Sequence, residues 1–241
     1  MSVTYRTLNN SPHTPMIPLL ERLTAIRERL HAAATRAARD PATIELMAVS
    51  KTFPIEAIQE ATDAGQTLFG ENRVQEILAK APSLAPHLRW HLIGPLQSNK
   101  IRKVLPHVEA IQSLDSLDLA RNIQRIATEL NLRPKVYLEI NIGAEASKHG
   151  FSPDALLAQF DDLLSLDRLD IQGLMGIPPF NENPEATRPH FMALRHLRDT
   201  LQTRSHLPLP ALSMGMSNDY EVAIEEGSTL IRVGTAIFGG R

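Results

Sequence analysis

Lys51 is the residue of this sequence best suited to nucleophilic chemistry. It follows five apolar or small residues (46–50), so a strand ending there would bring its amine into a partly dry site. Partial desolvation favours the neutral amine, and a neutral lysine amine attacks an aldehyde to form a Schiff base. The alternative is an ordinary surface lysine at a strand end. The competing lysines are expected on helix surfaces (Lys80, Lys103) or in polar loops (Lys100, Lys148).

A second group of residues has the composition of a phosphate site. Gly234 and Thr235 combine accessible backbone N–H groups with a hydroxyl, and Ser213 offers another hydroxyl from the preceding apolar run. Glycine at position 234 has no Cβ to keep the backbone away from phosphate oxygens. The alternative is that the glycine only relieves crowding between neighbouring strands.

Arg232 lies two residues before Gly234 and therefore points to the same side of its strand. A buried arginine needs an acceptor. One candidate is the pyridine nitrogen of pyridoxal 5'-phosphate (PLP); the other is an internal salt bridge with Glu139. Asn72 could flank a ring in the same site, whereas His91 is expected to be structural. No residues have the spacing of a metal site.

These residues require a scaffold, and eight short apolar runs alternate with helical stretches along the chain. The runs are residues 44–50, 67–70, 89–94, 108–113, 135–142, 170–177, 211–216 and 229–239. They lack strict alternation, as expected of parallel strands covered on both faces. Eight such units predict a single (β/α)8 TIM barrel, and no GxGxxG or GxxxxGK[ST] motif follows any run to favour an open nucleotide-binding sheet.

Helical spacing supports the alternation, and the functional residues of such barrels lie at the carboxyl ends of the strands. The helical stretches are residues 17–34, 54–65, 73–80, 98–104, 116–130, 152–166, 184–203 and 219–226. Lys51, Asn72, Ser213, Arg232 and the 234–235 pair all fall at or after strand ends. We expect a polar tail over residues 1–15 and one barrel domain over residues 16–241.

Composition excludes several classes of protein. The 241 residues carry a net charge of −2, which indicates neither a nucleic-acid nor a membrane-surface partner. Cysteine is absent, so disulfides and thiolate chemistry are excluded. No apolar stretch has the length of a membrane span or a secretory signal, and we expect a cytoplasmic protein.

Five motifs together resemble the pyridoxal phosphate homeostasis proteins (the YggS/PROSC group). They are AVSK (48–51), FGENRVQE (69–76), WHLIGPLQSNK (90–100), EINIGAEASKHGF (139–151) and LSMGMSNDYEVAIEEGSTLIRVGTAIFG (212–239). The resemblance runs from about residue 17 to the end and implies the fold of the N-terminal barrel of alanine racemase. It implies a Schiff base on Lys51, phosphate contacts from Ser213, Gly234 and Thr235, Arg232 facing the ring nitrogen, and Asn72 beside the cofactor.

The resemblance also implies a PLP-binding protein without catalytic residues, which keeps PLP available to PLP-dependent apo-enzymes. We expect a monomer. The main alternative is a PLP-dependent amino-acid racemase, but racemases of this fold need a second domain that supplies a tyrosine base, and only Tyr220 is expected near the mouth. A phosphosugar-type barrel enzyme, with Glu139 as its acid or base, is the third possibility.

Overall fold

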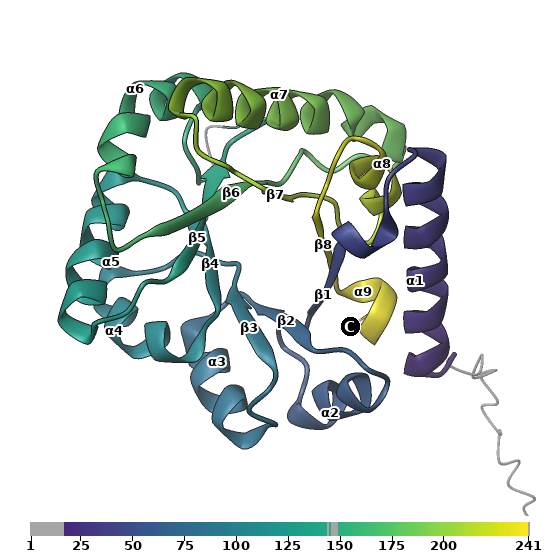
Figure 1. Ribbon diagram of the computed structural model, residues 1–241. Coiled ribbons are helices and arrows are strands. Elements are labelled where there is room, and N and C mark those ends of the chain that lie inside the picture. Colours follow the sequence, from purple (N-terminus) through teal and green to yellow (C-terminus); the bar gives the residue numbers. More distant parts are fainter. Residues whose placement is uncertain (1–16, 144, 146–148, 241) are drawn as a thin grey trace, which may run out of the picture.

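The chain forms a closed barrel of eight parallel strands, paired in chain order from β1 to β8. The computed structural model describes residues 17–143, 145 and 149–240, so the predicted tail at 1–15 and Lys148 lie outside the described residues. Figure 1 shows the ring of strands surrounded by helices. β8 pairs with β1 through four residue pairs, which closes the barrel. The predicted (β/α)8 fold is confirmed.

The strands are short, and the bounds of each strand lie close to the bounds of a predicted apolar run. They are β1 (Glu45–Val49), β2 (Leu68–Glu71), β3 (Arg89–Leu92), β4 (Ala110–Leu114), β5 (Lys135–Ile140), β6 (Asp170–Gly176), β7 (Ala211–Ser213) and β8 (Leu230–Val233). The last run differs from the prediction, because it divides into a strand and a short helix that begins at Thr235.

Helices follow the strands around the outside of the barrel. They are α1 (Leu19–Arg36), α2 (Ile55–Asp63), α3 (Val74–Lys80), α4 (Ile101–Val104), α5 (Leu117–Leu130), α6 (Pro153–Leu164), α7 (Arg188–Ser205), α8 (Tyr220–Glu225) and α9 (Thr235–Phe238). Short 3-10 turns cover Pro41–Thr43, Ala81–Ser83, Ser98–Lys100, Leu105–His107 and Pro184–Thr187. Across the described ranges, no helix combines the length and apolar character that a bilayer crossing requires.

Helix α5 shows how the sequence specifies these elements. Ser116 caps its first turn, and the Ser116 hydroxyl accepts a hydrogen bond from the backbone N–H of Leu119. Leu119 and Ile123 are four residues apart and both face the barrel, where they are buried. Asn131 ends the helix in the left-handed conformation, which asparagine tolerates better than most residues.

Alternate strand residues face the barrel interior and the surrounding helices, as strand geometry requires. Met47, Leu68 and Leu230 form an apolar cluster of their own. Their neighbours Ala48 and Phe69 instead belong to the cluster that includes the core face of α1. Both faces of these strands therefore carry apolar residues, which explains the lack of alternation in the sequence.

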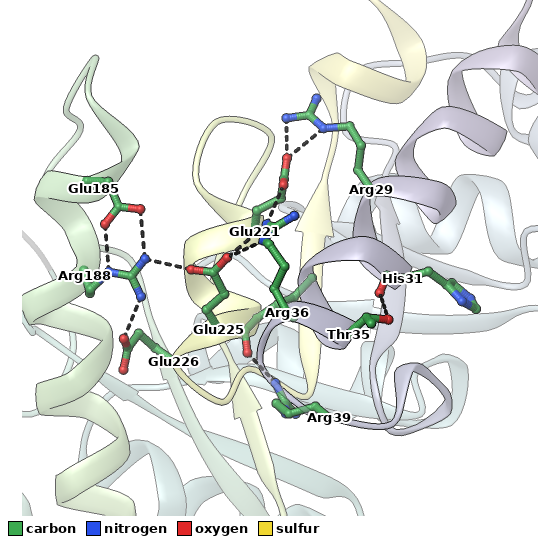
Figure 2. A network of polar contacts seen from close by, with 11 residues as sticks. Arg29, His31, Thr35, Arg36, Arg39, Glu185, Arg188, Glu221, Glu225 and Glu226 are labelled. Carbon is green, nitrogen blue, oxygen red and sulfur yellow. Dashed lines mark hydrogen bonds and ion pairs between the residues drawn. The ribbon is translucent and has the colours of Figure 1, made fainter.

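Helix α1 precedes the first strand and packs against the end of the chain, on α8 and α9 (Figure 1). Figure 2 shows an ionic network over this contact. Arg29 pairs with Glu221 at 2.6 Å, Arg36 with Glu225 at 2.9 Å, and Arg188 of α7 reaches the same Glu225 at 2.7 Å. Single exposed ion pairs contribute little, but this network joins three helices across the position where the barrel closes.

Candidate functional site at the barrel mouth

A cavity of about 540 Å³ lies at the carboxyl ends of the strands. Five of the six predicted site residues line it: Lys51, Asn72, Arg232, Gly234 and Thr235. They come from the ends of β1, β2 and β8, which are adjacent in the closed barrel. The structure thus brings together residues from both ends of the chain at the face where barrels of this type carry their sites.

Arg232 is the buried cation of the cavity. Its side chain donates through Nη1 to Ser213 Oγ at 2.6 Å and through Nη2 to the Gly176 carbonyl at 3.0 Å. Burial lowers the pKa of Arg232 to about 10, so the guanidinium is still charged at neutral pH. No salt bridge joins it to Glu139 in the described part of the chain. The guanidinium has five N–H donors, and its position suits a ligand atom that accepts a hydrogen bond without needing a proton.

A chain of hydrogen bonds runs from Arg232 through the barrel interior. Ser213 Oγ accepts from Arg232 and donates to Gln112 Oε1 at 2.6 Å. Gln112 Nε2 lies 2.9 Å from His91 Nδ1, and His91 Nε2 lies 3.9 Å from Glu109. Because Arg232 can only donate, each following group donates to the next, and His91 accepts at Nδ1. These hydrogen bonds fix the orientation of the Arg232 guanidinium from inside the barrel.

Ser213 occupies a different place from the one predicted. It is the last residue of β7, is fully buried, and is not among the residues that line the cavity. Its hydroxyl is occupied by Gln112 and Arg232, so the direct phosphate contact predicted for it does not fit this position. Ser217 lines the cavity instead. The second serine of SMGMS follows the strand by four residues, and the expectation that mouth residues lie past strand ends could have identified it.

Ser217, Gly234 and Thr235 gather at the start of α9. Ser217 Oγ accepts from the backbone N–H groups of Gly234 and Ala236, at 3.3 and 3.4 Å. A Cβ at position 234 would lie 3.3 Å from the Val49 carbonyl oxygen, so glycine here lets β8 continue close beside β1. The hydroxyls of Ser217 and Thr235 are donors of the kind that a phosphate group accepts from.

Glu139 and Asn72 also line the cavity, together with Asn141, His149 and Asn218. Burial raises the pKa of Glu139 to about 7, and the nearby Asp115 carboxylate acts in the same direction. The chain segments that follow β2 and β3 lie very close together. A Cβ at Gly94, after β3, would lie 2.3 Å from the carbonyl oxygen of Asn72, after β2. This contact fixes the backbone from which Asn72 extends into the cavity.

Two other residues, Tyr220 and Lys80, are buried where the sequence predicted more exposed positions. Tyr220, expected near the mouth, is 1% exposed, and Arg29 lies over its ring, 5.4 Å from the ring centroid. It does not line the cavity. Lys80, expected on a helix surface, is only 8% exposed and forms an ion pair with the buried Glu71 at 2.8 Å. Among the residues that the structure describes, no three His, Cys, Asp or Glu side chains are grouped as a metal would require.

The fold and the position of the site define a barrel of the alanine racemase N-terminal-domain class. The sequence profile of the family described as "Alanine racemase, N-terminal domain" matches residues 22–241. Curated relatives named "Pyridoxal phosphate homeostasis protein" are 46% identical in Aquifex aeolicus, covering 92% of this chain and 97% of the relative, and 44% identical in Pseudomonas aeruginosa, covering 94% and 97%. The chain belongs to the pyridoxal phosphate homeostasis protein family.

Solved structures agree with this assignment. The structure of PipY from Synechococcus elongatus with PLP bound is 42% identical, covers 92% of this chain and 100% of its own, and superposes with a TM-score of 0.81. Alanine racemase from Clostridium difficile is 15% identical with a TM-score of 0.73, which shows a shared fold alone. This chain covers 57% of the racemase chain.

Proposed function

We propose that this protein binds PLP as a Schiff base on Lys51 and keeps the cofactor available to PLP-dependent apo-enzymes. The main observation behind this proposal is the cavity, because Lys51, the buried Arg232 and a group of phosphate-type donors all line it. The support from comparison is the name of the curated relatives and the PLP-bound structure of PipY.

The proposed linkage uses the side-chain amine of Lys51. The Nζ atom attacks the aldehyde carbon, a C=N bond forms, and the aldehyde oxygen leaves as water, so the step needs no oxidant or metal. Lys51 is half-buried and lines the cavity together with Val49, two residues before it, so its side chain is partly shielded from solvent.

The remaining residues hold the cofactor in this proposal. Ser217 and Thr235 donate hydroxyls to the phosphate, which lies beside the Gly234 backbone. Arg232 faces the ring nitrogen, and Asn72 lies beside the ring. Ser213 acts indirectly, by holding the Arg232 guanidinium.

Ser217→Ala combined with Thr235→Ala is expected to weaken PLP binding much more than pyridoxal binding. Each hydroxyl-to-phosphate hydrogen bond is charge-assisted and contributes about 1.5–3 kcal/mol, so the double variant should lose about a hundredfold or more in PLP affinity. Pyridoxal has no phosphate group, so the affinity of the double variant for pyridoxal should fall only slightly. Equilibrium titration with both ligands measures the difference.

Ser213→Ala is the matched comparison for the double variant. Ser213 holds the arginine rather than the phosphate, so both ligands should lose affinity by a similar factor. If Ser213→Ala discriminated against PLP while the Ser217 and Thr235 replacements did not, the phosphate contact would belong to Ser213 after all.

A further inference from the structure

We propose that Lys80, Glu71 and Glu76 form a positioning cluster that fixes the backbone of Lys51 for attack on the aldehyde. The proposal rests on the proposed function, because it concerns the same lysine. None of the three side chains lines the cavity. Glu76 and Lys80 belong to α3 and Glu71 is the last residue of β2, and the three act on Lys51 only through its chain neighbours.

The ammonium group of Lys80 is the centre of the cluster. Its Nζ donates to Glu71 Oε1 at 2.8 Å, to Glu76 Oε2 at 2.8 Å and to the Ser50 carbonyl at 3.1 Å. An ammonium has three donors, and all three are used. Lys80 is therefore held in place, and it has no free donor with which to reach the cavity.

The cluster holds the two peptide groups on either side of the Lys51 Cα. The Ser50 carbonyl, which belongs to the peptide before Lys51, accepts from Lys80. The Thr52 N–H, which belongs to the peptide after Lys51, donates to Glu76 Oε2 at 2.7 Å. The Ser50 hydroxyl donates to Glu71 Oε1 at 2.7 Å. With both peptide planes held, the φ and ψ angles of Lys51 are fixed, and so is the direction of its Cα–Cβ bond.

Thr52 adopts a backbone conformation that supports this interpretation. Its φ is +67°, in the left-handed region that β-branched residues avoid. Such a turn persists only where surrounding contacts hold it, and the bond from Thr52 N–H to Glu76 is such a contact. The chain thus turns sharply just after Lys51, which lets the lysine leave the strand at the mouth.

Local sequence places the three charges in this arrangement. Glu76 and Lys80 are four residues apart and share one face of α3. Glu71 ends β2 immediately before that helix, and it is fully buried. Burial also raises the pKa of Glu71 to about 7. Buried ion pairs are a weak source of stability but can specify one geometry, which is the role proposed here.

The experiment compares PLP with 4-deoxypyridoxine 5'-phosphate, which has a methyl group in place of the aldehyde. The analogue tests the phosphate and ring contacts without the bond to Lys51. In Lys80→Met, PLP affinity is expected to fall about tenfold or more, whereas analogue affinity should change by less than about twofold. The full-length protein is used throughout. The control variant Lys103→Met replaces an exposed lysine on α4 and should change the affinity for neither ligand.

Removal of Lys80 alone leaves two carboxylates close together, so Lys80→Met/Glu71→Gln is measured as well. The double variant removes the buried charge pair and is expected to fold while still losing PLP affinity selectively. Equal losses for both ligands, or no loss in either variant, would overturn the positioning role. If the wild type bound both ligands equally and formed no covalent adduct, the proposed function itself would fall, and this inference with it.

Discussion

Lys51→Ala is expected to lower the affinity for PLP by about a hundredfold while leaving the affinity for 4-deoxypyridoxine 5'-phosphate nearly unchanged. Lys51 is the one lysine among the described residues that lines the cavity. Without it the aldehyde has no amine at the position that the strand end provides. The phosphate and ring contacts come from other strands and should remain.

Titration of wild type and variant with both ligands makes this measurement. Lys103→Ala is the control, since Lys103 is exposed on α4 and does not line the cavity. An equal loss for PLP and the analogue would mean that Lys51 supports the cavity rather than the covalent bond. Unchanged PLP affinity would place the reactive amine elsewhere.

The second large effect concerns catalysis: the PLP-loaded protein is expected to racemise alanine or serine at least about a thousandfold more slowly than an ordinary enzyme, whose turnover is roughly 1–10³ per second. The carbanion left by removal of the Cα proton is stabilised best when the ring nitrogen is protonated, and in the proposed site the charged Arg232 disfavours that proton. Arg232 cannot accept a proton itself, because its guanidinium is already protonated at neutral pH.

Among the residues that the structure describes, no tyrosine lines the cavity as a second base, which a two-base racemase of this fold would need. Within the described ranges, Tyr137 is buried in β5 and Tyr220 is buried under Arg29, and neither lines the cavity. A chiral chromatography assay of PLP-loaded protein measures the rate. Turnover at enzyme rates, lost in Lys51→Ala, would replace the carrier proposal with the racemase alternative.

Much of the fold could be predicted because each β/α unit carries its own local signals. The apolar runs identified all eight strands, and capping residues such as Ser116 marked helix starts. Lys51, Arg232 and Gly234 could be placed near one another because the ends of parallel strands meet at one face of a barrel. That residues from both ends of the chain lie close together follows from the barrel architecture and not from the residues themselves.

The differences from expectation have a common physical cause. The sequence does not show that β7 stops after three residues, at Ser213 itself, so it does not show that Ser213 is buried while Ser217 lines the cavity. Lys80 was expected at the surface because a glutamate and a lysine four residues apart are typical of an exposed helix face. Only the packing of α3 against the ends of β1 and β2 shows that Lys80 is buried and Glu76 half-buried.

The most direct test of the account is to locate the covalent bond. The full-length protein is loaded with PLP and reduced with borohydride, which converts a Schiff base to a stable secondary amine, and the digested peptides are then mapped by mass spectrometry. The account predicts that the label lies on Lys51. Recovery of the label mainly on Lys100 or Lys148, or no label at all in PLP-saturated protein, would contradict it.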